Sequence, residues 1–259
     1  MTDLIAIETD PRGVARLILN RPEKHNALSG DMIAEMTRAA KRLASDAAVR
    51  VVVLEGAGKS FCAGGDLAWM KAQIDADGAQ RASEARKLAD MLEALNALPK
   101  PLIGRLHGGA FGGGVGMACV CDVAIGAEGI KLGLTETRLG LIPATIGPHV
   151  VARMGEAMAR RVFMSSRIFD AAEAVTLGIL ARAVPAEDLD AAVEAEVTPY
   201  LSCAPQAVAE AKALARRLGG TGTDAAREDS IKALVKRWDH PEAREGVSAF
   251  FEKRSPDWT

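Results

Sequence analysis

Two short stretches of small residues are the clearest candidates for chemistry in this sequence. Three successive glycines, Gly112–Gly114, stand before the apolar segment Val115–Val120, and Phe61–Leu67 (Phe-Cys-Ala-Gly-Gly-Asp-Leu) follows a β-branched run. Glycine lets backbone N–H groups come close to a ligand, and a helix amino terminus adds a favourable partial positive charge. Either stretch could hold an anionic oxygen. Tight helix–strand packing or an ordinary strand-to-helix turn would use the same residues.

The glycine-containing segments of the chain do not fit a nucleotide-binding motif. Gly58-Lys59-Ser60 ends like a P-loop, but the position of the other required glycine is Val53. The glycines between Gly108 and Gly116 do not satisfy GxGxxG in any register. The sequence therefore gives little support to a dinucleotide or nucleotide phosphate site.

The elements that position these stretches alternate between strands and helices. Apolar, β-branched runs predict strands at Leu4–Thr9, Val14–Asn20, Val49–Leu54, Pro101–His107 and Asp122–Gly126. The first two runs are separated by the turn Asp10–Gly13, which predicts a hairpin. Apolar residues three to four apart predict two helices, one with Met32, Met36, Ala39 and Leu43 and one with Leu88, Leu92, Leu95 and Leu98. This alternation favours an α/β fold built from βαβ units.

The carboxyl-terminal part of the chain has a different pattern. After Gly147 strand-forming runs nearly vanish, and helical periodicity is found in Glu187–Tyr200, Pro205–Leu218, Asp224–Trp238 and Pro241–Phe251. We therefore expect a sheet-bearing core over residues 1–195 and a helical region over residues 196–259. Gly219–Gly222 predicts a short hinge between two of these helices.

Composition limits the possible partners. Of 259 residues, 49% are hydrophobic and 25% are charged, and the net charge of −2 favours neither nucleic acid nor an anionic membrane surface. No uncharged apolar stretch approaches the ~18 residues of a membrane span. The cysteines and histidines lack metal-ligand spacing, so no metal site is expected. Four unpaired cysteines and the lack of a secretory signal predict a cytoplasmic protein.

Taken together, the motifs resemble the crotonase (enoyl-CoA hydratase/isomerase) superfamily in order and spacing. The matching segments cover essentially the whole chain: Asn20–Leu28 (Asn-Arg-Pro-Glu-Lys-His-Asn-Ala-Leu), Phe61–Leu67, Gly112–Gly114, Glu136, Leu139–Pro143 and Phe251–Arg254. The resemblance implies a crotonase-like ββα spiral with a helical carboxyl-terminal region. It also implies a homotrimer or a dimer of trimers, an acyl-CoA thioester substrate and no separate cofactor.

In that family two backbone N–H groups bind the thioester oxygen, and by motif position these are the N–H groups of Ala63 and Gly113. Family hydratases commonly carry two catalytic glutamates. Glu136 matches the second of them, whereas the position of the first is Gly116. A hydratase with two carboxylates can use one for water and the other for the α-carbon proton. With Glu136 alone, one group must do both in sequence or leave part of the work to bound water.

Three functions remain open. The first is an enoyl-CoA hydratase; Asp66–Lys71 and Leu141–Pro148 resemble bacterial 3-methylglutaconyl-CoA hydratase-like members, which implies a branched or glutaconyl substrate and a place in leucine degradation. The second is an enoyl-CoA Δ-isomerase that uses Glu136 alone, and the third is a non-catalytic acyl-CoA-binding protein. The resemblance assigns substrate or CoA contacts to Lys24, Ala63, Gly64, Gly65, Asp66, Gly113 and Lys253. It assigns the acyl pocket to Trp69, Met70, Gly116 and Pro143.

Overall fold

The computed structural model describes residues 4–219 and 224–257 of the chain. Its main sheet has six strands in the order β1-β2-β3-β4-β6-β9. Only β1 and β2 are antiparallel to each other, and the other neighbours in this sheet run parallel. The strands are β1 (Ile5–Thr9), β2 (Val14–Leu19), β3 (Val51–Gly56), β4 (Leu102–Leu106), β6 (Val123–Ala127) and β9 (Arg182–Val184).

A second, smaller sheet contains the strand that leads into Gly112–Gly114. It contains β5 (Gly109–Phe111), β7 (Lys131–Gly133) and β8 (Ile168–Asp170), with β7 in the centre. Two isolated parallel bridges, Cys62 to Ala110 and Leu28 to Gly65, extend it. The chain passes from β4 directly to β5 and from β6 directly to β7, so two strands of the main sheet continue into the smaller one.

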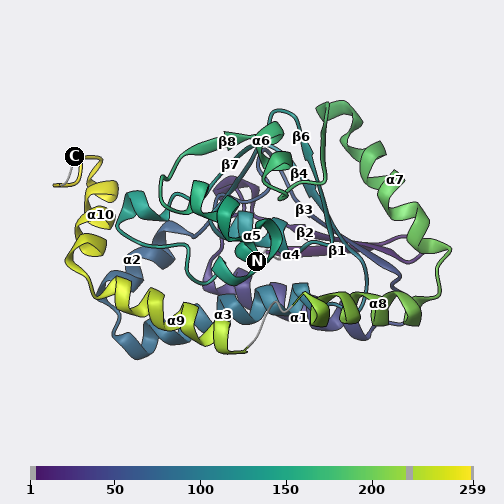
Figure 1. Ribbon diagram of the computed structural model, residues 1–259, viewed down its shortest axis with the longest axis horizontal. Helices are drawn as coiled ribbons and strands as arrows, with labels where there is room; N and C mark the ends of the chain where they lie inside the picture. Colours follow the sequence, from purple (N-terminus) through teal and green to yellow (C-terminus); the bar gives the residue numbers. More distant parts are fainter. Residues whose placement is uncertain (1–3, 220–223, 258–259) are drawn as a thin grey trace.

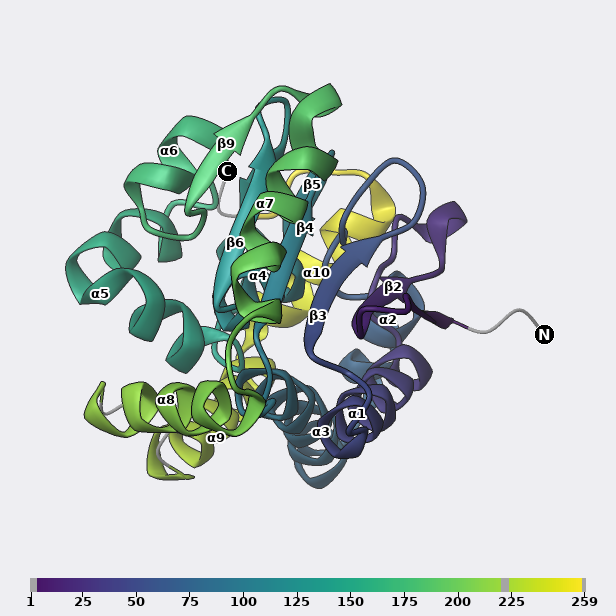
Figure 2. The ribbon, with the colours of Figure 1, turned by 90° about the vertical axis from the view of Figure 1, so that its right-hand side faces the viewer.

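Helices cover both faces of the main sheet (Figures 1 and 2). The core on one face includes residues from α1 (Gly30–Ser45), α3 (Gly78–Asn96), α4 (Gly113–Val120) and α5 (Gly147–Phe163). On the other face α7 (Leu189–Leu201) lies across the strands, in front of β4 and β6 in Figure 2. The other helical elements are η1 (Pro22–Lys24), α2 (Leu67–Asp75), η2 (Glu136–Leu139), α6 (Ala171–Thr176), η3 (Ala186–Asp188), α8 (Pro205–Leu218), α9 (Asp224–Trp238) and α10 (Pro241–Glu252).

Strand β3 shows why an uninterrupted apolar run suits this position. Val52 and Leu54 point into the core that contains α1 and α3, while Val51 and Val53 pack with residues of α7. Side chains alternate between the two faces of a strand, so a strand buried on both faces needs apolar residues at every position. The first four residues of β3 fit this rule, and its one buried charged residue, Glu55, is paired with Arg16 at 2.7 Å.

Most of the predicted elements are confirmed. The amino-terminal hairpin forms as β1 and β2, and Ser29 caps α1 by accepting a hydrogen bond from the Met32 N–H at 3.2 Å. The carboxyl-terminal helices also form, and α9 has the predicted bounds. The sequence analysis missed β5, β7, β8 and β9, because a strand of three residues is too short to carry a visible period.

Two predictions about chain organisation are not decided by the fold. Gly219 caps the carboxyl end of α8, and residues 220–222 of the predicted hinge lie outside the described residues. The division near residue 195 stays a prediction. Within the described ranges, no helix combines the length and the apolar character that a membrane span requires.

Candidate active site

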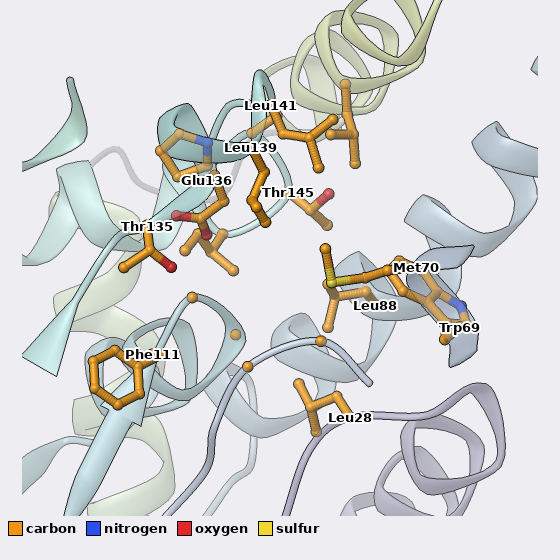
Figure 3. A pocket seen from close by; sticks show the side chains of 18 of the residues that line it. Leu28, Trp69, Met70, Leu88, Phe111, Thr135, Glu136, Leu139, Leu141 and Thr145 are labelled. Atoms are coloured by element: carbon orange, nitrogen blue, oxygen red, sulfur yellow. The ribbon is translucent and has the colours of Figure 1, made fainter. Parts of the chain in front are cut away.

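The two glycine-rich stretches and Glu136 line one cavity of about 370 Å³. This volume lies in the range of small-molecule sites. The walls come from the loop after β3, the amino terminus of α4, η2 and the segment after it, α2, α3, and the helices α9 and α10 (Figure 3). The elements are far apart in sequence, and the spiral of the chain brings them together.

Backbone pairing holds the two stretches side by side. The Cys62 N–H donates to the Gly109 carbonyl and the Phe111 N–H donates to the Cys62 carbonyl, each at 3.0 Å. Gly112 has φ 47° and ψ −110°, and α4 begins at the next residue. Its carbonyl accepts from the Gly116 N–H at 3.0 Å, along the helix. In a trans peptide the N–H points opposite to the carbonyl, so the Gly113 N–H points out of the helix amino terminus.

The predicted role of the Ala63 N–H is wrong. This group donates to the His25 carbonyl at 2.9 Å and is therefore not free to bind a ligand. The Gly64 N–H faces the buried Cys62 sulfur. The Gly64 carbonyl accepts from the Leu28 N–H at 2.7 Å, so the N–H of the same peptide unit, which belongs to Gly65, points away from Leu28.

The Gly65 N–H has no acceptor among the described residues, and Gly65 lines the cavity. It is therefore the donor that this loop offers beside Gly113. The motif alone could not distinguish Ala63 from Gly65, because the choice depends on the positive φ of 93° at Gly64, which turns the following peptide.

Glu136 faces these donors from the first position of η2. Its Oε1 lies 3.0 Å from the point where a Cβ on Gly112 would stand. Its Oε2 is buried and has no hydrogen-bond partner among the described residues. Burial raises the pKa of the Glu136 carboxyl to about 7, and the smaller effect of its own backbone N–H acts to lower it. A carboxyl with this pKa can both accept and donate a proton near neutral pH.

The turn that carries Glu136 is fixed on two sides. The Ser166 hydroxyl accepts from the Arg138 N–H at 2.9 Å and contacts the Thr137 hydroxyl at 2.6 Å. From α9, the Arg237 guanidinium donates to the Gly140 carbonyl. The helical carboxyl-terminal region therefore holds the loop with the candidate acid/base in place.

At Gly116, where the first family glutamate would stand, the structure leaves no space for a side chain. A Cβ added to Gly116 would stand 2.7 Å from Cγ2 of Ile146. Gly116 is buried in α4 and is not part of the cavity wall, so its predicted place in the acyl pocket is wrong. Ile146 fills the space and itself lines the cavity, so neither substrate nor a replacement water occupies this point.

The other predicted pocket residues do line the cavity. Trp69, Met70 and Pro143 are part of its wall, and the Trp69 indole N–H donates to Glu84 at 2.9 Å. The sequence analysis missed Trp238 and Phe250, which reach the same cavity from α9 and α10. Their helical periodicity predicts a buried face but not the surface that it covers. Most of the lining side chains are apolar, which suits an acyl chain.

Asp66 has a structural role in place of the predicted substrate contact. One carboxylate oxygen caps α2 by accepting from the Ala68 and Trp69 N–H groups, at 2.9 and 3.1 Å, and the other accepts from Arg21 at 2.8 Å. Burial acts to raise the pKa of this carboxyl, but these hydrogen bonds and the Arg21 charge outweigh it and lower the pKa. The Asp66 carboxylate is thus fully used within the fold.

The predicted CoA contacts Lys24 and Lys253 are exposed and lie outside the cavity wall. Their roles stay predictions. Within residues 4–219 and 224–257, no cluster of His, Cys, Asp and Glu side chains is arranged to bind a metal ion.

Comparison with known proteins identifies the group of enzymes to which this site belongs. The family model described as "Enoyl-CoA hydratase/isomerase" matches residues 9–259. The chain belongs to the enoyl-CoA hydratase/isomerase family. The enzymes of this family act on acyl-CoA thioesters, and the fold is the crotonase fold.

Individual relatives match along nearly their whole length. The probable enoyl-CoA hydratase of Mycobacterium tuberculosis is 33% identical over 268 residues, which covers 99% of this chain and 98% of that protein. The crystal structure of an enoyl-CoA hydratase from Mycobacterium avium superposes with a TM-score of 0.88 at 33% identity, over 100% of both chains. A Shewanella pealeana enoyl-CoA hydratase structure gives a TM-score of 0.81 at 36% identity, over 99% of this chain and 96% of that one.

Proposed function

We propose that this member of the enoyl-CoA hydratase/isomerase family is a hydratase, which adds water across the double bond of a 2-enoyl-CoA. The observation that carries the proposal is the position of Glu136, whose carboxyl has a pKa of about 7 and lies against the loop that supplies a backbone donor. The relatives named as hydratases support the same choice.

The thioester oxygen would bind between the N–H groups of Gly65 and Gly113. Attack on the β-carbon pushes an electron pair onto this oxygen, and two fixed donors stabilise the resulting enolate. Loss of one such donor typically costs roughly 3–4 kcal/mol of transition-state stabilisation. Both donors belong to the backbone, so they are already in place before the charge develops.

Glu136 would perform both proton transfers in sequence. As a carboxylate it takes a proton from water while the water oxygen bonds to the β-carbon. As a carboxylic acid it returns that proton to the α-carbon, and the enolate collapses to the thioester. The sum is the addition of one water molecule, and Glu136 ends as the carboxylate. A pKa near neutrality serves both half-steps.

The cavity wall favours an uncharged acyl chain, straight or branched. Among the described lining residues the charged side chains are Glu136 and Arg138, and Arg138 is exposed. A glutaconyl substrate carries a second carboxylate, which would need Arg138 or solvent as its partner. We therefore rank 3-methylglutaconyl-CoA below substrates with an apolar chain. The trimer or dimer of trimers, the cytoplasmic location and a role in leucine degradation stay predictions from the family resemblance.

A Δ-isomerase is the second candidate, and a specific observation favours it. Ile146 closes the place of the first family glutamate, and Glu136 is the one carboxylate among the described residues of the cavity wall. One carboxylate is sufficient to move a proton between the α- and γ-carbons.

The experiment that separates these functions uses the wild type and the Glu136→Gln variant in ¹⁸O-labelled water. Crotonyl-CoA, 3-methylglutaconyl-CoA and a 3-enoyl-CoA serve as substrates, with the products followed by mass. We expect ¹⁸O incorporation into crotonyl-CoA, reduced about 10²- to 10⁴-fold in Glu136→Gln. A shifted double bond without added water would make the protein an isomerase. Binding of all three without any product would favour the acyl-CoA-binding protein.

A further inference from the structure

Thr145 places an unused hydroxyl group in the wall of the cavity. The residue lies in the segment between η2 and α5, and only 5% of its surface is exposed. Its Oγ1 is buried and has no hydrogen-bond partner among the described residues. Figure 3 shows Thr145 beside Leu139, on the same wall as Glu136 and toward Met70.

A buried hydroxyl without a partner destabilises a fold, because it gives up its hydrogen bonds to water and receives none in return. Valine has nearly the same shape as threonine and would avoid this cost. The fold therefore does not need the Thr145 hydroxyl, and the group is available to a molecule that enters the cavity.

The surroundings of Thr145 indicate what that molecule is. Its neighbour Ile146 covers Gly116, and among the described lining residues Glu136 is the one carboxylate that can hold a water molecule. Thr135 also lines the cavity, but it is only partly buried. Water addition nevertheless requires an oxygen held within a mainly apolar wall, with its lone pair directed at the β-carbon. One contact to Glu136 leaves that orientation undefined, and a second contact would define it.

We infer that the Thr145 hydroxyl hydrogen-bonds the oxygen that is added at the β-carbon. This is the reacting water in the hydration direction and the 3-hydroxyl group in the reverse direction, so the inference rests on the proposed hydratase function. Thr145 keeps its own proton throughout. The water proton goes to Glu136 and then to the α-carbon, the C–O bond forms at the β-carbon, and the electron pair is held as the enolate between the two transfers.

Two variants test this role, Thr145→Val and Thr145→Ser. Three quantities are measured on the wild type and both variants: steady-state hydration of crotonyl-CoA, exchange of the α-proton of butyryl-CoA in D₂O, and unfolding in urea. Exchange needs the oxyanion donors and Glu136 but no added oxygen. Crotonyl-CoA carries no acyl oxygen except its thioester carbonyl, so an effect on its hydration reports on the added water.

We expect Thr145→Val to be at least as stable as the wild type, and its exchange rate to stay within about twofold. Its hydration kcat should fall about 10- to 100-fold, the size expected for one hydrogen bond made in the transition state. Thr145→Ser should recover most of the hydration rate, because it keeps the hydroxyl and loses only a methyl group.

Other outcomes overturn the inference. Unchanged hydration of crotonyl-CoA in Thr145→Val, or a defect restricted to 3-methylglutaconyl-CoA, would show that the hydroxyl does not contact the added oxygen. Hydration and exchange falling together would place the effect on Glu136. Lower stability of Thr145→Val would show that the hydroxyl is paired within the fold. A wild type that shifts double bonds but adds no water would refute the hydratase function itself, and the inference with it.

Discussion

Behind one wall of the cavity the polar side chains are used within the fold, whereas two buried polar atoms of the opposite wall, which carries Glu136 and Thr145 in Figure 3, are not. The segment from Arg21 to Leu28 and the loop after β3 are joined by backbone, amide and carboxylate hydrogen bonds. Across the cavity, Glu136 Oε2 and Thr145 Oγ1 are buried without partners among the described residues. Backbone donors must be held in place by the surrounding hydrogen bonds. Acid/base and water-binding groups must keep hydrogen-bonding atoms unpaired so that they can contact the ligand.

The two carboxylates show the difference most clearly. Hydrogen bonds and the Arg21 charge lower the pKa of Asp66, although burial opposes them, and burial raises the pKa of Glu136 to about 7. The lowered pKa of Asp66 marks a carboxylate that the fold stabilises. The raised pKa of Glu136 marks a carboxylate that the fold destabilises, as is typical of a group that transfers protons.

The largest effect on stability is expected at Asn26, which joins the segment from Arg21 to Leu28 to the loop after β3. Asn26 is fully buried, accepts from the Arg21 N–H at 2.9 Å, and donates to the carbonyls of Ala57 and Ser60 at 2.9 and 2.8 Å. Asn26→Ala leaves all three groups unpaired and puts alanine at a φ of 56°. We expect a loss of about 2–4 kcal/mol in the free energy of unfolding, measured in urea. A loss below about 1 kcal/mol would contradict this role of Asn26.

A substitution at Glu136 is expected to increase the free energy of unfolding, in contrast to Asn26→Ala. The folded-state pKa of about 7 lies above the unfolded value, so the folded protein holds this proton more tightly. The resulting penalty is absent below pH ~4.5, grows as pH rises, and is complete above pH ~7. Glu136→Gln removes the charge and should be more stable than the wild type at pH 8, by up to about 3 kcal/mol. Urea unfolding at pH 5 and pH 8 measures the change, and a gain independent of pH would show that the buried charge is not its cause.

Gly112→Ala tests the contact between the two walls. The new Cβ would stand 3.0 Å from Glu136 Oε1, at a φ of 47° that disfavours alanine. We expect kcat for hydration to fall about 10-fold as the carboxyl is displaced, a barrier change of about 1.4 kcal/mol. Gly129→Ala is the matched control, because a Cβ there meets no atom within 4 Å. Equal rates for the two variants would show that the position of Glu136 tolerates the contact.

Sequence patterns predicted the frame of this molecule better than its site. The hairpin, the buried strand β3 and the carboxyl-terminal helices follow from periodicity, turn residues and caps, which are local properties. The family motif led to the correct loop but to the wrong donor, Ala63. The direction of an N–H depends on partners such as His25 and Leu28, which are distant in sequence. Ile146 over Gly116 and Thr145 in the wall depend in the same way on packing between separate segments.

The smallest effect is expected for Asp66→Asn, and its pH dependence should be opposite to that of Glu136→Gln. Asparagine can still cap α2, so the change removes mainly the charge that pairs with Arg21. The folded pKa of Asp66 lies below the unfolded value of 3.8, so its charge stabilises the fold above that pH and ceases to do so as pH falls through the folded pKa. We expect a loss of about 1 kcal/mol at pH 7, shrinking toward zero in acid, as measured by urea unfolding from pH 7 downward. If both carboxylate variants shifted stability in the same direction with pH, the contrast between the two walls would be wrong, whatever their kinetics.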